Sequence, residues 1–370
     1  MSCITPSEYT QVIGLKEVVD FCVRCMEKVS VSHSHSESLA NVLVAGDYRG
    51  HYSHGLNRLE MYVADIEKGV CVCNKEPVIV KETVSTALVN GGNLLGPVVG
   101  NFAMQLAIKK ARSTGIGWIA VNGSNHYGIA GWYSLMAVKE GLIGMSFTNT
   151  SPLVYPTRSK GRALGTNPLT VAAPSSKAGD EFVLDMATSA VALGKLEMCR
   201  RRGLSIPDGW AADDSGKSTN DPAVGISKGA LMPLGGLEHT SGYKGYGLGM
   251  MVELFCGILS GAHYGSNIRQ WMKTERPANL GQGFVAIDPN AFGFGFEDRL
   301  SDYMRMMREL PRVDDSEPVL VPGDPERRHM AECDELGGIP YPPVLIESMA
   351  SLNRLADRLG VARMPVLKTL

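Results

Sequence analysis

The sequence predicts an α/β fold, and three observations point to that class. Short apolar runs rich in β-branched residues, typical of buried strands, are interspersed with segments whose apolar residues recur at helical spacing. The chain has 370 residues, enough for two or three domains or for one domain interrupted by another. No internal repeat or low-complexity tract suggests a solenoid or a fibrous protein.

The chain is expected to begin with helices. Apolar residues at helical spacing predict one helix over residues 15–29, and Ser36 could cap a second helix that runs to Tyr48. The stretch 47–58 follows, with two arginines, two histidines and three hydroxyl-bearing side chains. Surface loops seldom concentrate hydrogen-bond donors so heavily, and this stretch therefore predicts a site for an anion.

The middle of the chain predicts a strand that leads into a histidine turn. Strands are expected at 78–80 and 86–89 around a turn at Lys81 and Glu82, followed by the glycine-rich loop 91–97 and a helix over 98–111 that Gly115 closes. Strands at 117–122 and 142–147 then flank the turn 124–128 and a helix over 129–139.

His126 lies on this turn. Ligands of open α/β sheets bind where strands end, and an imidazole with an ordinary pKa of about 6.5 can exchange a proton there. The alternative is a histidine that only bonds the loop backbone.

The second half of the chain continues the alternation. A turn at 165–168 precedes a strand, a polar loop is expected at 213–221, and 322–325 is a proline- and glycine-rich break before the last helix. Further strands are predicted at 169–172, 182–185 and 284–288, and helices at 190–201, 246–259 (buried), 300–310 and 344–359.

Composition limits the partners and the compartment. The formal net charge is −2 and no basic block is present, so the chain lacks the electrostatic footprint that nucleic acid requires. The N-terminal residues do not have the pattern of a secretory signal, and the apolar stretch 246–262 contains Glu253 and is too short to span a membrane. Eight cysteines at irregular spacings indicate reduced thiols and a cytoplasmic protein, and Cys22-x-x-Cys25 is best explained by core packing.

Common nucleotide and metal motifs are missing. No Gly-x-Gly-x-x-Gly follows a strand, and the glycines at 245–249 have the wrong spacing. Gly216-Lys217-Ser218 imitates the end of a phosphate loop, but Ala211 stands where its first glycine should be. His51 and His54 have no evident third ligand, so no metal site is expected.

Five segments, read together and in order, resemble the malate/L-lactate dehydrogenase family that is unrelated to the Rossmann-type dehydrogenases. That family includes ureidoglycolate and sulfolactate dehydrogenases and reductases of cyclic imino acids. The segments are Arg49-Gly50-x-x-Ser53-His54-Gly55-x-x-Arg58, Ser124-Asn125-His126-Tyr127-Gly128, Gly165-Thr166-Asn167-Pro168, Leu184-Asp185-Met186-Ala187-Thr188-Ser189 and Gly242-Tyr243-Lys244-Gly245-Tyr246-Gly247.

The resemblance implies a non-Rossmann nicotinamide-binding α/β fold with a mainly antiparallel central sheet. It also implies a helical domain in which residues 1–75 are completed by residues 300–370, a cofactor-binding and catalytic domain over 76–299, and a homodimer. The cofactor is expected to be NAD, with NADP possible.

The resemblance assigns roles at the substrate. His126 is the general acid/base, while Arg58 and Arg49 grip the substrate carboxylate, because a planar guanidinium can donate two parallel hydrogen bonds to it. Surface salt bridging is the alternative for both arginines. Ser53 and His54 complete the pocket, and His54 is the second choice for proton donor.

It also assigns cofactor contacts, each with a simpler alternative. Lys244 would meet pyrophosphate or ribose oxygens, or is a solvated lysine; Asp185 would contact cofactor or cap a turn. Thr166 and Asn167 bind cofactor or shape their own turn. The remaining candidates are Thr150, Met186, Ala187 and the late loop Pro322, Gly323 and Asp324.

The expected function is interconversion of a small 2-hydroxy acid and its 2-oxo acid, malate or L-lactate being the leading substrates. Reduction of a cyclic 2-imino carboxylate is the alternative within enzymes, since the same arginines and histidine would serve. A catalytically silent binding homologue is the alternative outside them.

Overall fold

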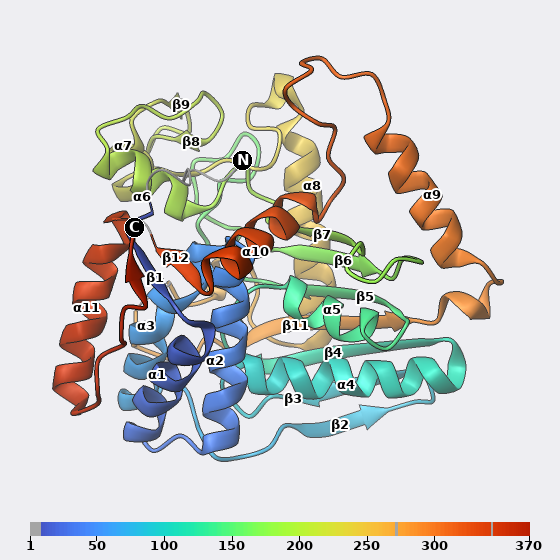
Figure 1. Cartoon of the computed structure of the whole chain (residues 1–370), viewed down its shortest axis with the longest axis horizontal. Coiled ribbons are helices and arrows are strands. Elements are labelled where there is room, and N and C mark those ends of the chain that lie inside the picture. Colours follow the sequence, from blue (N-terminus) through green and yellow to red (C-terminus); the bar gives the residue numbers. More distant parts are fainter. Residues whose placement is uncertain (1–8, 271–272, 342) are drawn as a thin grey trace.

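A seven-stranded sheet forms the centre of the molecule (Figure 1). The computed structural model describes residues 9–270, 273–341 and 343–370, so the N-terminal residues examined for a signal lie outside the described part. β3 and β4 pair in parallel, whereas the other neighbouring strands pair antiparallel, which confirms the mainly antiparallel sheet. The order is β2 (Val78–Glu82), β3 (Thr86–Asn90), β4 (Ile116–Ser124), β11 (Leu280–Ile287), β5 (Ile143–Thr148), β6 (Leu169–Ala173) and β7 (Phe182–Met186).

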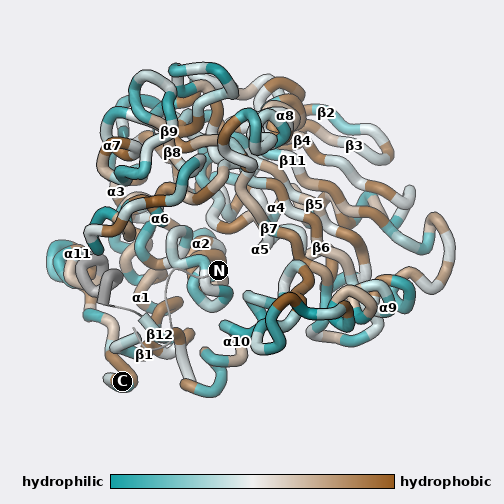
Figure 2. Tube along the Cα trace, turned by 90° about the horizontal axis from the view of Figure 1, so that it is seen from above, coloured by the Kyte–Doolittle hydropathy of each residue, from teal (hydrophilic) through white to brown (hydrophobic). Residues whose placement is uncertain are grey.

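Helices cover both faces of this sheet. α4 (Gly96–Thr114) and α5 (Gly131–Val138) bury one face around Tyr133 and Phe284. α8 (Gly242–Glu253) and the π-helical η5 (Leu254–Ile258) bury the other face around Phe147. Figure 2 shows hydrophobic residues along the strands, as a sheet covered on both faces requires.

The two ends of the chain share a second core. Phe21, Leu39 and Leu355 belong to one buried cluster, so N-terminal and C-terminal helices pack together. The described elements of this lobe are β1 (Gln11–Ile13), α1 (Leu15–Lys28), α2 (His33–Tyr48), α3 (Leu59–Glu67), α10 (Asp324–Leu336), β12 (Ile339–Tyr341), α11 (Pro343–Leu359) and β13 (Lys368–Thr369). The domain limits at residues 75 and 300 stay a prediction.

Shorter elements complete the fold. α9 (Phe296–Arg308) lies at the outer edge of the molecule (Figure 1). A small sheet forms from β8 (Ala211–Ala212), β9 (Ser218–Thr219) and β10 (Ala230–Leu231), beside α6 (Leu193–Arg201) and α7 (Pro222–Ser227). The 3-10 turns are η2 (Tyr52–His54), η3 (Leu56–Arg58), η4 (Glu238–Thr240), η6 (Gly265–Asn267) and η7 (Pro289–Ala291).

Some local predictions differ from the structure. α2 begins at His33, so Ser36 lies inside the helix and Ser32 occupies the N-cap position. Lys81 and Glu82 belong to β2 and pair with β3 after a register shift, so the turn lies beyond them. The helix predicted at 246–259 begins at Gly242, and it is not buried all round, because one side faces outward. The break at 322–325 contains the start of α10, since a proline in the first turn costs no helical hydrogen bond. In the described part, no helix is both long and apolar enough to cross a bilayer.

Candidate active site

The polar stretch after α2 folds into the tight turns η2 and η3. The buried Asp47 carboxylate holds them by accepting hydrogen bonds from the Leu56 backbone N–H (3.0 Å) and the Tyr341 hydroxyl (2.8 Å). A Cβ atom at Gly55 would lie 1.8 Å from Asp47 Oδ1, which explains the glycine. This bracing fixes the backbone of the loop that carries the donor side chains.

His126 sits two residues after the end of β4, as predicted. The side-chain amide of Asn125 donates to the backbone oxygen of Leu94 (2.9 Å), and Gly128 has a positive φ of 76° that suits glycine. A Cβ atom at Gly96 would lie 2.2 Å from the His126 backbone oxygen. The turn is therefore held closely against α4.

Four of the predicted residues meet at one place. The His54 and His126 rings are stacked, with centroids 5.9 Å apart and planes 10° apart. Ser53 Oγ lies 2.9 Å from His54 Nδ1, and Arg58 Nε donates to the Ser53 backbone oxygen at 2.6 Å. These contacts bring Ser53, His54, Arg58 and His126 together. The charge of Arg58 acts on both imidazoles.

Electrostatics keep both imidazoles neutral at pH 7. Burial and the nearby Arg58 charge lower the pKa of His126 to about 3. Burial, with smaller effects of His126 and Arg58, holds the pKa of His54 well below its usual range. A carboxylate bound to Arg58 would offset that positive charge and raise both pKa values. A neutral imidazole is the form that accepts a proton from a hydroxyl group.

Arg49 lies in a different environment from Arg58. Its Nη1 donates to Met330 Sδ of α10 at 3.5 Å, and its charge interacts with Glu326 and Asp185. The described contacts therefore place Arg58 beside the two histidines and Arg49 beside a predicted cofactor segment. A carboxylate contact by Arg49 stays a prediction.

Asp185 connects the end of β7 to the helix that follows His126. Its Oδ2 accepts a hydrogen bond from the Gly131 backbone N–H at 2.7 Å, at the start of α5. Burial raises the pKa of this carboxyl, and the charges of His51 and Arg49 oppose the effect. The contact that the structure shows is thus with α5 rather than with the turn after Asp185, and a cofactor contact of Asp185 stays a prediction. Met186 and Ala187 follow and are half-buried.

The Asn167 side chain joins its turn to Thr150 and to α8. Its Oδ1 accepts from the Thr150 backbone N–H (3.0 Å), and its Nδ2 donates to the Gly249 backbone oxygen and to Glu253 (both 3.1 Å). The Thr150 and Thr166 hydroxyl oxygens lie 3.4 Å apart at this turn. Asn167 therefore positions Thr150 against α8, and Lys244 is exposed in the first turn of the same helix.

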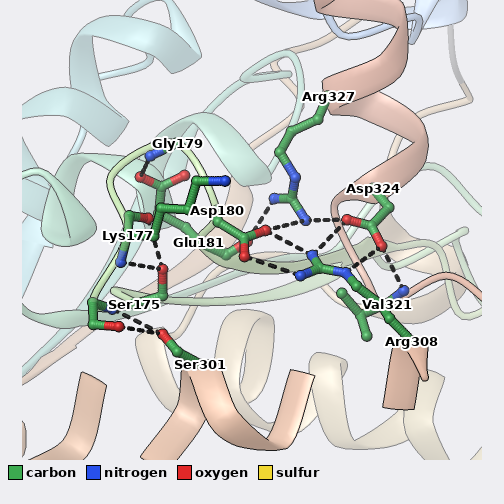
Figure 3. A network of polar contacts seen from close by, with 11 residues as sticks. Ser175, Lys177, Gly179, Asp180, Glu181, Ser301, Arg308, Val321, Asp324 and Arg327 are labelled. Atoms are coloured by element: carbon green, nitrogen blue, oxygen red, sulfur yellow. Dashed lines mark hydrogen bonds and ion pairs between the residues drawn. The ribbon is translucent and has the colours of Figure 1, made fainter. Parts of the chain in front are cut away.

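The late loop is held by an ion-pair network around Asp324 (Figure 3). Arg308 donates to Asp324 and to Asp180, and Arg327 donates to Asp324 at 2.6 Å. Although burial opposes ionisation, these arginines and the Val321 N–H keep the pKa of Asp324 well below its usual range. The network braces the loop. The Pro322 backbone oxygen accepts from the Val183 N–H at 3.1 Å, and Gly323 has a φ of 103°.

The predicted cofactor residues fit a nicotinamide dinucleotide, which presents ribose hydroxyls and an anionic pyrophosphate. Lys244 supplies an exposed ammonium group and Thr150 a half-buried hydroxyl. Beside Asp185, Nε2 of His51 lies 3.5 Å from Glu326 Oε1 and, among the described residues, has no hydrogen-bond partner. A ligand hydroxyl would supply one. Within the described residues, no cluster of three or more histidines, cysteines or carboxylates could hold a metal ion.

Sequence reasoning did not predict two residues of this site. Tyr62 touches His126, and Asp47 braces the loop that carries His54. The spacing of Arg58 and Tyr62, four residues apart at the start of a helix, puts them on one face and could have indicated a shared role. Asp47 gave no signal, because its partner Tyr341 is distant in the sequence.

Comparison with known proteins identifies the family of the chain. Residues 13–350 match the family described as malate/L-lactate dehydrogenase. The chain is 41% identical to malate dehydrogenase of Pyrococcus abyssi over 353 residues, covering 95% of each protein. The structure of malate dehydrogenase from Pyrococcus horikoshii superimposes with a TM-score of 0.87 at 36% identity, covering 96% of this chain and 97% of that one.

A further solved structure is delta1-piperideine-2-carboxylate reductase from Pseudomonas syringae, with a TM-score of 0.81 at 27% identity over 94% of this chain and 100% of that one. The family match spans nearly the whole chain, and it includes both His126 and Arg58. The chain therefore belongs to the malate/L-lactate dehydrogenase family and is an NAD(P)-dependent oxidoreductase that acts on CH–OH groups.

Proposed function

We propose that this enzyme interconverts a small 2-hydroxy acid and its 2-oxo acid, with His126 as the general acid/base. The observation that carries the proposal is a half-buried cluster of one guanidinium and two imidazoles: Arg58 donates to the Ser53 backbone, Ser53 contacts His54, and the His54 and His126 rings are stacked. A 2-hydroxy acid has a carboxylate next to the reacting carbon. One substrate of this kind can therefore engage both groups at once.

Arg58 and His126 have separate roles in the proposed reaction. Arg58 binds the substrate carboxylate and so fixes the adjacent carbon. His126 takes the hydroxyl proton during oxidation and returns it to the carbonyl oxygen during reduction. The bound nicotinamide cofactor accepts or supplies the hydride. Ser53 holds Nδ1 of His54, which orients the second imidazole beside the first.

Malate or L-lactate is the proposed substrate, and NAD the proposed cofactor, with NADP as the other candidate. Similarity to the malate dehydrogenases of two Pyrococcus species supports a dicarboxylate. Similarity to delta1-piperideine-2-carboxylate reductase supports the second candidate function, reduction of a cyclic 2-imino carboxylate. Such a substrate presents a carboxylate to Arg58 and an imine nitrogen to His126.

A substrate panel tests the proposal. Purified full-length protein is mixed with oxaloacetate, pyruvate or a cyclic imino acid, each with NADH and with NADPH, and the loss of cofactor absorbance is followed. We expect the highest kcat/KM with oxaloacetate or pyruvate. A clear preference for the imino acid would select the second function, and no turnover with any pair would favour a silent homologue.

We further propose that the enzyme is a cytoplasmic homodimer. The described cysteines, Cys22, Cys25, Cys71, Cys73, Cys199, Cys256 and Cys333, are all free, which is consistent with a reducing compartment. Support for the dimer comes from apolar side chains that α8 and η5 leave exposed.

A further inference from the structure

Tyr62 contacts the proposed proton-transfer residue directly. It lies on α3, one helical turn after Arg58, and only 2% of it is exposed. Its hydroxyl oxygen lies 2.5 Å from Nδ1 of His126 and 3.4 Å from the backbone oxygen of the same residue. The two rings are 5.8 Å apart and tilted by 58°, so the contact is made by the hydroxyl group rather than by stacking.

The hydroxyl can serve both protonation states of the imidazole. A tyrosine O–H donates and also accepts, whereas each ring nitrogen does one or the other according to its proton. When Nδ1 carries a proton, Nδ1–H donates a hydrogen bond to the Tyr62 oxygen, and the tyrosine hydrogen turns toward the His126 backbone oxygen. When Nδ1 is bare, Tyr62 donates to it, as the Gly128 backbone N–H also does at 3.4 Å.

We infer that Tyr62 is a positioning residue for His126: it holds Nδ1, so that Nε2 is the nitrogen that exchanges a proton with the substrate oxygen. This inference rests on the proposed function of His126. In oxidation the substrate O–H bond breaks and its proton forms a bond to Nε2, which converts the neutral ring to an imidazolium. In reduction the same proton returns to the substrate oxygen. In the tautomer that does this, Nδ1–H donates to Tyr62 before and after proton transfer, and the Gly128 N–H, 3.4 Å from Nδ1, does not bond the ring.

The neighbouring groups make this contact more important than a surface hydrogen bond. The Arg58 charge disfavours the imidazolium form of His126, and the burial of the site does the same. An oxygen that accepts from Nδ1–H is then one of the groups that favours the protonated ring. Tyr62 itself stays uncharged, because burial raises the pKa of its hydroxyl far above the usual range.

The variant Tyr62→Phe removes only this oxygen and keeps the ring. We expect kcat for reduction at neutral pH to fall about 10- to 100-fold, since a buried N–H loses its partner when the imidazole is protonated. The KM for the reduced cofactor should change little. The apparent pKa in the pH profile of kcat should be lower than in the native enzyme, for oxidation and for reduction alike, because the imidazolium is harder to form.

Tyr133→Phe is the matched control. Tyr133 is also fully buried, and its hydroxyl donates to a backbone oxygen, that of Tyr127, at 2.6 Å. It touches the same turn but not the imidazole. We expect a comparable loss of thermal stability in both variants and a shifted pH profile only in Tyr62→Phe. Equal kcat and an unchanged pH profile in Tyr62→Phe would overturn the inference.

A spectroscopic measurement covers the case in which the variant is too unstable for kinetics. Long-range ¹H–¹⁵N correlation spectra of protein labelled on histidine report which ring nitrogen carries a proton, and His126→Asn identifies the His126 signals by subtraction. We expect Tyr62→Phe to change the Nδ1 signal of His126, and an unchanged signal would count against the contact. If the native protein turns over no substrate, the proposed function fails while this measurement still tests the contact.

Discussion

His126 and His54 are nearly equivalent in their surroundings. Each ring has a hydroxyl group on Nδ1, Tyr62 for the former and Ser53 for the latter, and the two rings lie parallel. Both are affected by the Arg58 charge. The assignment of the acid/base role therefore depends on a comparison of the two histidines under identical conditions.

The substitution His126→Ala should lower kcat by about 10²- to 10⁴-fold, since that is what a positioned acid/base contributes. His54→Ala is its matched comparison, and we expect a smaller loss in kcat from it. Steady-state kinetics in both directions, with circular dichroism to confirm folding, provides the measurement. A larger loss for His54→Ala would transfer the role to His54, and near-normal turnover of His126→Ala would remove His126 from the mechanism.

The substitution Arg58→Lys keeps the positive charge but loses the planar fork that matches a carboxylate. We expect the KM for the 2-oxo acid to rise about tenfold or more while the KM for the reduced cofactor stays close to that of the native enzyme. Arg49→Lys is the informative control, because Arg49 contacts Met330 and interacts with Asp185. Equal increases in both KM values for Arg58→Lys would contradict a carboxylate role.

At the level of single residues, sequence reasoning found the site residues that belong to short local motifs. Ser53, His54, Arg58 and His126 could be predicted because each belongs to a short pattern, and the structure brings them together. Tyr62 was not predicted as a site residue, because its hydroxyl acts on a residue 64 positions away. The structural use of Asn167 was likewise undecidable, since its partners on α8 are remote in sequence.

At the scale of elements, the turns η2 and η3 depend on one buried carboxylate. Burial raises the pKa of Asp47 to about 7, while the Leu56 N–H and the Tyr341 hydroxyl partly oppose that rise. The carboxyl therefore titrates at a higher pH in the folded protein than in the unfolded chain. Its stabilising contribution is complete below the unfolded pKa of about 4 and is lost as the pH rises through about 7.

Replacement of this group should flatten the dependence of stability on pH. We expect the free energy of unfolding of the native protein, relative to that of Asp47→Asn, to decrease by a few kcal/mol between pH 5 and pH 8. Urea unfolding at several pH values measures this difference. Asp214→Asn, at an exposed position, serves as the control and should follow the native protein. A constant difference between native and Asp47→Asn protein would contradict the predicted titration.

The element predictions failed where tertiary contacts decide the outcome. The strand β2 extends through Lys81 and Glu82 because pairing with β3 continues past a register shift, which composition does not reveal. The outward face of α8 was missed because its apolar residues surround the helix. Such a pattern indicates burial on every side, and the structure buries only the side toward the sheet.

At the scale of the molecule, α8 and η5 present an apolar stripe to the outside. Met250, Leu254 and Ile258 follow at intervals of four, and they are 52%, 50% and 57% exposed. Residues at this spacing share one helical face. A contiguous apolar surface of this kind is typical of a protein interface, which supports the proposed homodimer.

The substitution Leu254→Glu should therefore shift the protein from dimer to monomer, because it places a charge in the centre of the stripe. Light scattering coupled to size-exclusion chromatography measures the mass at several concentrations. Val84→Glu is a matched control at another exposed apolar position, 78% exposed on the hairpin between β2 and β3. A native protein that elutes as a monomer would contradict the dimer. A Leu254→Glu variant that remains a dimer would show that the interface lies elsewhere.

The shared core of the two chain ends has a consequence for biosynthesis. Tyr341 donates to Asp47, and the Tyr52 hydroxyl donates to the Pro340 backbone oxygen at 2.5 Å, so the loop with His54 is fastened by residues translated after every strand of the central sheet. Before these two residues are made, all seven strands of the sheet have been translated, whereas the groups that fasten the catalytic loop have not. Premature termination before Pro340 should therefore yield inactive protein even where the sheet has already formed.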